Sequence, residues 1–145
     1  MEAVIKALCI SKERGTAKTN VDKIEFIENY GLKGDAHAGS WHRQVSLLSY
    51  DRVEEFKERG GNVEVGAFGE NILAEGIDFK KLPIGTILRS NEVSLLVTQI
   101  GKTCHSHCEI YHQVGDCIMP REGIFAKVLT GGKLKVGDKL YVVSI

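Results

Sequence analysis

Residues 82–100 read Leu82-Pro-Ile-Gly-Thr-Ile-Leu-Arg-Ser-Asn-Glu-Val-Ser-Leu-Leu-Val-Thr-Gln-Ile100, and their pattern indicates β structure. The apolar and β-branched runs Thr86–Arg89 and Glu92–Ile100 are typical of strands. The pair Ser90-Asn91 between them is typical of a tight turn. These residues therefore predict a β-hairpin.

The turn that precedes this hairpin has a counterpart near the end of the chain. Leu82-Pro-Ile-Gly85-Thr-Ile-Leu88 resembles Leu134-Lys-Val-Gly137-Asp-Lys-Leu140, and in each the glycine permits a left-handed backbone before a strand begins. The polar, basic stretch Ser11–Thr19 is expected to be a mobile loop. Further strand-like segments recur at short intervals: Val4–Ser11, Lys23–Glu28, Val45–Leu48, Asn71–Ala74, Gly123–Leu129 and Lys139–Ile145.

One segment has the pattern of a helix. Ser49 suits the N-cap, Val53 and Phe56 fall on one face, and Gly60-Gly61 would end the helix. The chain also has sixteen glycines but only two prolines, which favours many tight turns between short strands. Together these features favour a mainly β fold, a closed or partly open β-barrel with one or two short helices.

Composition limits the classes of function. The chain has 145 residues and a formal net charge of zero, so nothing in the charge balance indicates binding to nucleic acid or to an anionic membrane surface. No apolar run approaches the roughly 20 residues of a membrane span, and the first residues lack the apolar stretch of a signal peptide. We therefore expect a single domain over residues 1–145 in the cytoplasm, where the four cysteines serve as thiols or ligands rather than as disulfides.

Thiols and imidazoles are concentrated in residues 101–121, Gly-Lys-Thr-Cys104-His-Ser-His-Cys108-Glu-Ile-Tyr-His-Gln-Val-Gly-Asp-Cys-Ile-Met-Pro-Arg121. This segment holds three of the four cysteines and three of the five histidines, side chains that bind soft metals or carry sulfur. Cys104 or Cys108 is expected to form a thiolate whose pKa is lowered by Lys102 and the adjacent histidines. The alternative is that both cysteines are small buried hydrophobic residues.

A zinc site in the same segment is a separate possibility. The three histidines could supply nitrogen ligands, but residues 104–108 are too crowded for four ligands to reach one ion without strain. We therefore expect no structural zinc. Cys117 either resolves an oxidised Cys104 or Cys108 or fills the barrel wall, and Cys9, inside a predicted strand, is expected in the core.

A second polar cluster lies earlier in the chain. Gly34-Asp-Ala-His37 precedes Arg43, which opens the predicted strand Val45–Leu48. An arginine and a histidine so placed suit an anion such as a phosphate, or instead a capping salt bridge. Gly66-Ala-Phe-Gly-Glu-Asn71 is a glycine-rich turn whose backbone N–H groups could face an anion, although a short turn alone does not define such a site.

Together these segments resemble the MOSC domain, named for the C-terminal part of molybdenum-cofactor sulfurases. The resemblance covers nearly the whole chain, in order, and is greatest to the small stand-alone bacterial form. It is carried by the motifs above and by Arg43-Gln-Val-Ser-Leu-Leu48, Gly76-Ile-Asp78, Val97-Thr-Gln-Ile-Gly101, Gly115-Asp-Cys-Ile-Met-Pro-Arg-Glu-Gly-Ile-Phe-Ala-Lys-Val-Leu129 and Val136-Gly-Asp138.

The resemblance implies a β-barrel related to the barrel domain of pyruvate kinase, with a pocket cysteine that carries sulfur or, in the amidoxime-reducing relatives, binds molybdenum directly. Those larger relatives have a Cys-x-x-Cys spacing, whereas this chain has Cys104-x-x-x-Cys108, so either cysteine could be the functional one. The pyridoxal-phosphate domain of the long sulfurases has no counterpart in these residues, and no pyridoxal phosphate is expected here. Sulfur is therefore expected from a partner, either a pyridoxal-phosphate cysteine desulfurase or another protein of molybdenum-cofactor biosynthesis.

For this chain the resemblance implies a role in molybdenum-cofactor metabolism, as a sulfur carrier or a molybdopterin-binding protein. Cys108 or Cys104 would carry persulfide sulfur, and Cys108 would bind molybdenum if the metal is present. Two alternatives are a molybdenum-dependent reductase of N-hydroxylated compounds with a separate electron donor, and a non-catalytic cofactor-binding module. Arg43, His37 and Arg121 would hold the phosphate of molybdopterin, and Asn71 would contact the pterin edge. The full set expected to bind the cofactor is His37, Arg43, Asn71, Lys102 and Arg121.

Overall fold

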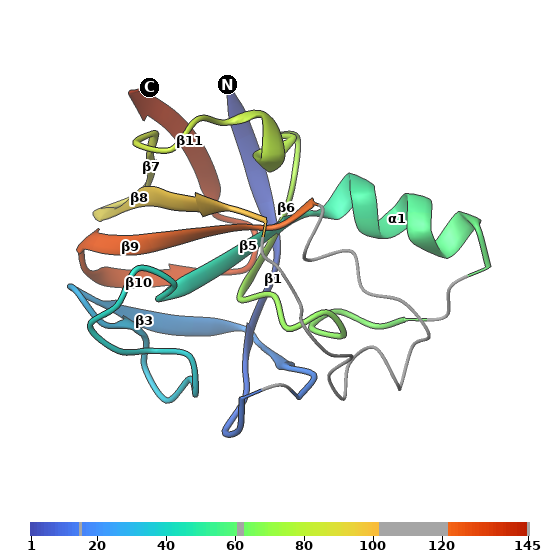
Figure 1. Cartoon of the computed structure of the whole chain (residues 1–145), viewed down its shortest axis with the longest axis horizontal. Coiled ribbons are helices and arrows are strands. Elements are labelled where there is room, and N and C mark those ends of the chain that lie inside the picture. The colour runs from blue at the N-terminus through green and yellow to red at the C-terminus, as the bar shows by residue number, and fades with distance from the viewer. Residues whose placement is uncertain (15, 61–62, 102–121, 145) are drawn as a thin grey trace.

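The computed structural model describes residues 1–14, 16–60, 63–101 and 122–144 (Figure 1). They contain one α-helix, α1 (Tyr50–Glu58), and one short 3-10 helix, η1 (Phe79–Lys81). The described strands are β1 (Glu2–Ile10), β2 (Thr19–Val21), β3 (Lys23–Ile27), β4 (Gly31–Leu32), β5 (Val45–Ser49), β6 (Ile72–Glu75), β7 (Ile87–Ser90), β8 (Val93–Ile100), β9 (Ile124–Thr130), β10 (Gly132–Lys135) and β11 (Lys139–Ser144).

Seven of these strands close into a barrel. The hydrogen-bonded order runs β1, β6, β5, β9, β8, β7, β11, and β11 pairs back onto β1, so the first and last strands lie side by side (Figure 1). β2 pairs with the last residues of β1 and is not part of the ring. The prediction of a mainly β fold built on a closed barrel is therefore confirmed.

The position of helix α1 is explained by the one parallel pair of strands in the ring. β5 and β6 run parallel, and parallel neighbours need a crossover, which α1 supplies. Val53 and Phe56 are buried, as predicted, and Ser49 occupies the N-cap position, although its side chain makes no capping hydrogen bond. No helix in the described part of the chain is long and apolar enough to cross a membrane.

Successive side chains along the barrel strands point to opposite faces of the sheet, and they contribute to two separate hydrophobic cores. Leu47 and Ile72 belong to the core inside the barrel. Their neighbours Leu48 and Leu73 belong to the second core, which includes Val53 and Phe56 of α1. Both faces of β5 are therefore covered, which explains why all five of its residues are buried.

A three-stranded sheet, in the order β10-β3-β4, packs against the barrel core. Phe26, Leu32 and Leu134 from its three strands join the interior cluster. The sequence did not indicate β2, β4 or β10, because each is only two to four residues long, and β10 also pairs with the distant strand β3.

The predicted hairpin forms between β7 and β8, one residue later than expected. Ser90 pairs with Val93, so the loop is Asn91-Glu92 rather than Ser90-Asn91. Asn91 has a φ of 52°, a left-handed conformation that asparagine tolerates better than most residues. The two related turns also behave as predicted, since Gly85 and Gly137 have φ values of 97° and 100° just before β7 and β11.

Candidate functional site

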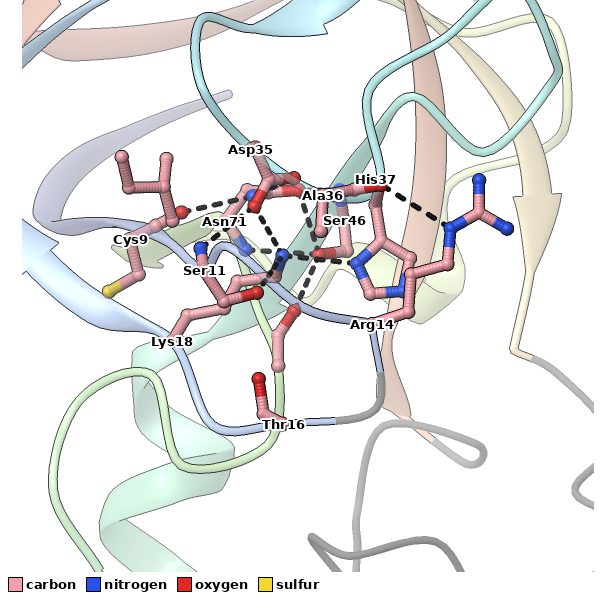
Figure 2. Close-up of polar contacts among 12 residues, drawn as sticks. Cys9, Ser11, Arg14, Thr16, Lys18, Asp35, Ala36, His37, Ser46 and Asn71 are labelled. Carbon is pink, nitrogen blue, oxygen red and sulfur yellow. Dashed lines mark hydrogen bonds and ion pairs between the residues drawn. The ribbon is translucent and has the colours of Figure 1, made fainter.

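A buried polar network joins the end of β1, the segment before β2, the loop after β4 and the starts of β5 and β6 (Figure 2). We call it the lysine network, and its members are Ser11, Lys18, Asp35, Ser46 and Asn71. Lys18 Nζ lies 2.6 Å from Asp35 Oδ1, and neither side chain is accessible to solvent. Asp35 also accepts hydrogen bonds from Ser11 N at 3.0 Å and from Asn71 Nδ2 at 3.1 Å. Three donors around one buried carboxylate are what its negative charge requires.

Asn71 connects this network to the barrel wall. Its Nδ2 donates to the Cys9 carbonyl at 3.0 Å as well as to Asp35. Its Oδ1 accepts from Ser46 N at 2.9 Å and from Ser46 Oγ at 3.1 Å. The fully buried amide is thus bonded to protein groups on every side, and its expected contact with a pterin stays a prediction.

The glycine-rich turn at residues 66–69 encloses an anion of the protein itself. Glu70, which is buried, accepts hydrogen bonds from Gly66 N at 2.7 Å and from Phe68 N at 3.2 Å. Burial raises the pKa of Glu70, and these backbone N–H groups work against that effect. Gly66 has a φ of +84°, and a Cβ there would lie 1.9 Å from the Lys18 carbonyl oxygen. The turn therefore packs closely against the Lys18 backbone. Its two N–H groups are hydrogen-bonded to the Glu70 carboxylate.

Burial also changes the other titratable groups beside this turn. It lowers the pKa of Lys18, while Asp35 favours the charged ammonium. It raises the pKa of the Cys9 thiol to about 12, and nearby Glu70 adds to the shift. Cys9 is fully buried, which confirms its prediction as a core residue, and its thiol is unreactive at neutral pH.

A second group of cations lies on an aromatic surface, and we call Arg14 and Arg43 the arginine pair. Both guanidinium carbons lie over the Trp41 ring, at 5.0 Å for Arg14 and 5.1 Å for Arg43. Arg43 also lies 5.6 Å from the centre of the Phe125 ring. Trp41 Nε1 donates to the His37 carbonyl at 2.8 Å, so His37 and Arg43 are brought together through Trp41.

The arginine pair lacks the partners that the lysine network has. Arg43 Nε is buried and makes no hydrogen bond, and among the described residues no carboxylate forms an ion pair with either arginine. Arg14 Nε donates to the Ala36 carbonyl at 3.3 Å, its one hydrogen bond to a described residue. Guanidinium groups held on an aromatic face, without a carboxylate partner within the described chain, are suited to an external anion.

Gly101, the last described residue before the cysteine segment, is connected by hydrogen bonds through Gln99 to His42, the residue that precedes Arg43. His42 Nε2 lies 2.8 Å from Gln99 Oε1, and Thr98 Oγ1 donates to the His42 carbonyl. Gln99 Nε2 in turn donates to the Gly101 carbonyl at 2.7 Å, and Gly101 N donates to the Gly123 carbonyl at 2.7 Å. Residues 101 and 123, which flank the cysteine segment, therefore meet each other close to the residue that precedes Arg43.

An open hollow of about 520 Å³ is lined by Ser11 and its neighbours in the segment between β1 and β2. Lys12 and Glu13, of opposite charge, both line it, together with the hydroxyl-bearing Thr16 and Thr19. Mixed charge gives this hollow no preference for an anion.

The structure brings together His37 and Arg43 from the predicted set and places Asn71 deeper, within the lysine network. The other predicted site residues, together with Cys117, lie outside the described residues: Lys102, Cys104, Cys108 and Arg121. No three histidine, cysteine, aspartate or glutamate side chains gather as metal ligands within the described ranges, and the absence of structural zinc stays a prediction.

Sequence reasoning missed Arg14, Lys18 and Trp41. Arg14 and Lys18 fall in the stretch expected to be a mobile loop, yet Lys18 is buried. Trp41 is the only tryptophan of the chain and stands between His37 and Arg43 in the sequence. The signal available in the sequence was that this large aromatic residue lies in a polar segment.

Comparison with solved structures supports the fold. YuaD from Bacillus subtilis is similar over 100% of this chain and 97% of its own, with a TM-score of 0.83 and 21% sequence identity. YiiM from Escherichia coli gives a TM-score of 0.71 and 21% identity over 100% of this chain and 71% of its own. YiiM from Geobacillus stearothermophilus gives 0.65 and 19% over 97% of this chain and 73% of its own.

At these identities the likeness establishes the fold alone. No curated protein sequence matches the chain significantly. The model of the MOSC domain matches residues 34–141, which include Arg43, Asn71 and the barrel strands from β5 to the first residues of β11. The chain therefore belongs to the MOSC domain family, which is associated with the molybdenum cofactor.

Proposed function

We propose that this protein holds the molybdenum cofactor through its phosphate at the arginine pair, and that Cys108 or Cys104 carries persulfide sulfur or binds the molybdenum. His37 and Arg121 are the further groups assigned to the phosphate. The chain acts in molybdenum-cofactor metabolism, in the cytoplasm, as a sulfur carrier or cofactor-binding protein.

The observation that carries this proposal is that the Arg43 guanidinium, held on the Trp41 and Phe125 rings, has neither an acceptor for its buried Nε nor a carboxylate partner among the described residues, whereas Arg52, whose Nε also lacks an acceptor, is paired with Glu55. A buried guanidinium N–H without an acceptor costs free energy, on the order of 1–3 kcal/mol, and Arg43 Nε has no acceptor within the described chain. A doubly charged phosphate offers several oxygen acceptors and the opposite charge. Such a ligand would relieve the cost that the protein carries without it.

The alternative interpretation of Arg43 as half of a capping salt bridge has no support in the described residues. The buried ion pair of this region joins Lys18 to Asp35, which leaves Arg43 without that carboxylate. Trp41 and Phe125 instead hold the guanidinium by ring contacts, at 5.1 Å and 5.6 Å. Ring contacts fix its position without supplying an acceptor for its N–H groups.

The described residues of the site fit a phosphate-bearing pterin in charge. Two guanidinium groups supply the positive charge, and Gly101, the last described residue before the cysteine segment, is bonded to Gln99, which in turn contacts His42. When bound, the cofactor supplies a redox-active metal that takes sulfur as a ligand. The protein's own part is to bind the phosphate, orient the pterin and present a thiolate.

If the cysteine acts as a sulfur carrier, the sulfur arrives by exchange with a partner. The thiolate of this chain would attack the terminal sulfur of a persulfide on a cysteine desulfurase, and the partner's thiolate would leave. One sulfur–sulfur bond forms and one breaks, so no external oxidant is needed. The desulfurase would use its own pyridoxal phosphate to form the persulfide that enters this exchange.

Intact-protein mass spectrometry, with metal analysis of the same sample, tests the proposal. Protein produced together with the cofactor pathway is expected to carry either one added sulfur on Cys104 or Cys108, or a pterin with molybdenum. Protein that carries neither, and that does not bind cofactor released from a denatured molybdoenzyme, would contradict it. Cys104→Ser and Cys108→Ser variants identify which thiol is loaded.

A further inference from the structure

We propose that the outer face of the small sheet β10-β3-β4 is a docking surface for a short, carboxylate-rich segment of a partner protein. We call it the basic face, and its members are Lys23, Glu25, Lys33, Lys133 and Lys135. None of them belongs to the lysine network or to the arginine pair, so the inference does not depend on cofactor binding.

Alternation along the strands places these side chains on the side of the sheet that faces away from the barrel. Phe26 and Leu134 belong to the core inside the barrel, and Ile24 packs against it. The residues that alternate with these three on β3 and β10 are members of the basic face, and all members are exposed. The two strands lie side by side (Figure 1), so their exposed residues form one continuous surface.

The register of the strands brings like charges together on this face. Lys135 of β10 is directly opposite Lys23 of β3, and the Cβ atoms of such a pair lie about 5 Å apart. Lys133 is opposite Glu25, and the Glu25 carbonyl accepts a hydrogen bond from Lys33 N at 3.0 Å. Four lysines and one glutamate make the face positive, although the whole chain has a formal net charge of zero.

The ammonium groups of this face are not neutralised within the described part of the chain. Other exposed lysines have partners, since Lys6 pairs with Glu75 at 3.6 Å and Lys57 with Glu54 at 3.5 Å. No lysine of the basic face forms an ion pair with a described carboxylate, that of Glu25 included. Because like charges opposite each other destabilise a sheet, bound carboxylates would offset a cost that the free protein carries.

A hollow of about 190 Å³ opens beside the two opposed lysines, lined by Lys23, Asn91, Lys133, Leu134, Lys135 and Asp138. Asp138 Oδ2 accepts hydrogen bonds from Lys135 N and Asn91 Nδ2, and its negative charge disfavours a small free anion inside the hollow. A peptide segment can instead place its carboxylates over the exposed lysines. Lys133 and Lys135 are two residues apart on one strand, and alternate side chains of an extended acidic segment have the same spacing, about 6.6 Å.

The residue types of this face favour a protein over a nucleic acid. Every positive charge on it is a lysine, and it has no arginine to read a base and no aromatic ring on which a base could stack. A lysine ammonium is compact and strongly hydrated. Such charges act mainly by raising the rate at which an acidic partner associates. We therefore expect binding that is weak and that decreases with added salt.

Titration of ¹⁵N-labelled protein with octaglutamate at low salt, followed by amide chemical shifts, tests the proposal. Shifts should centre on β3 and β10, and Lys23→Gln combined with Lys135→Gln should weaken binding about 3- to 30-fold. Lys6→Gln combined with Lys57→Gln removes the same charge elsewhere and should bind nearly as wild type. The absence of binding, an equal loss in this control, or shifts centred on the arginine pair would overturn the proposal, as would tighter binding of an oligothymidylate of the same charge.

The melting temperature of the same double variant separates binding from folding. Lys23→Gln with Lys135→Gln removes a like-charge pair, so it should melt at the wild-type temperature or up to about 4 °C above it. Weaker binding together with unchanged or higher stability is the expected result. A melting temperature several degrees below that of wild type would show that these lysines serve the fold, and would overturn the proposal.

Discussion

The lysine network and the arginine pair lie in neighbouring parts of the same loops, yet their positive charges have opposite surroundings. Lys18 is completely buried and bonded to Asp35 at 2.6 Å. Arg43 is held by aromatic rings, and its buried Nε has no acceptor in the described chain. The first arrangement is complete without a ligand, whereas the second is not.

This difference distinguishes groups that maintain the fold from groups that bind. Native proteins satisfy nearly all of their buried polar atoms, so an unsatisfied one calls for an explanation such as a ligand. Loss of a member of the lysine network should therefore reduce stability, and loss of an arginine should reduce binding. The stability predictions below run from the largest expected effect to the smallest.

Asp35→Ala should have the largest effect on stability, because it leaves the Lys18 ammonium buried without a counter-ion. We expect the free energy of unfolding to fall by about 3–5 kcal/mol in urea denaturation. Asp138→Ala is the matched control, since Asp138 accepts bonds from Lys135 N and Asn91 Nδ2 on the exposed surface. It should cost about 1 kcal/mol, and equal losses in the two variants would remove the distinction between the network and the surface.

Gly66→Ala tests how closely the glycine turn packs on Lys18. The new Cβ would lie 1.9 Å from the Lys18 carbonyl oxygen at a φ of +84°. Gly34→Ala has nearly the same φ, +83°, but its closest contact is Ile10 Cδ1 at 3.9 Å. The control should cost about 1–2 kcal/mol of stability from the backbone alone, and Gly66→Ala about 1–3 kcal/mol more.

Equal melting temperatures for Gly66→Ala and Gly34→Ala would contradict the close packing of the turn against the Lys18 carbonyl oxygen. The comparison needs only thermal unfolding followed by circular dichroism. Because the two backbone conformations are alike, the difference isolates the contact.

Alkaline pH should destabilise the protein through Cys9. Its pKa is raised to about 12 in the folded protein, whereas an unfolded chain loses this proton near its usual pKa of about 8.5. Between these values the folded state binds more protons, so stability falls as pH rises, by up to about 1.4 kcal/mol per pH unit. Cys9→Ala should have a shallower slope above pH 9, and parallel slopes would contradict the account.

Arg43→Met should change stability least, by less than about 1 kcal/mol. The variant keeps an unbranched apolar side chain between neighbours such as Trp41 and Phe125, and it breaks no ion pair with a described residue. Urea denaturation measures the change. A loss as large as that of Asp35→Ala would make Arg43 a structural residue.

Local patterns in the sequence predicted what depends on neighbours along the chain. The hairpin of β7 and β8 was predictable because alternation and a turn-forming asparagine occur together within residues 86–100. The short strand β10 pairs with β3, more than a hundred residues earlier in the chain, and such pairing leaves no local signal. The sequence therefore predicted the barrel but not the small sheet beside it.

The candidate site divides in the same way. His37 and Arg43 stand out as polar residues beside a buried strand, so the sequence could nominate them. The burial of Lys18 depends on Asp35, 17 residues away, and the carboxylate of Asp35 is bonded to Asn71, a further 36 residues along. Arg14 joins the site only because folding places it against Trp41.

The most direct test is the affinity of Arg43→Met for the molybdenum cofactor, measured against wild type and against Arg52→Met. Arg52 is a suitable control because it lies on α1, paired with Glu55 at 3.0 Å. We predict that Arg43→Met weakens binding about 10- to 100-fold, the loss of one or two charge-assisted hydrogen bonds to the phosphate, while Arg52→Met binds as wild type. Undiminished binding by a folded Arg43→Met would contradict the claim that the arginine pair holds the phosphate.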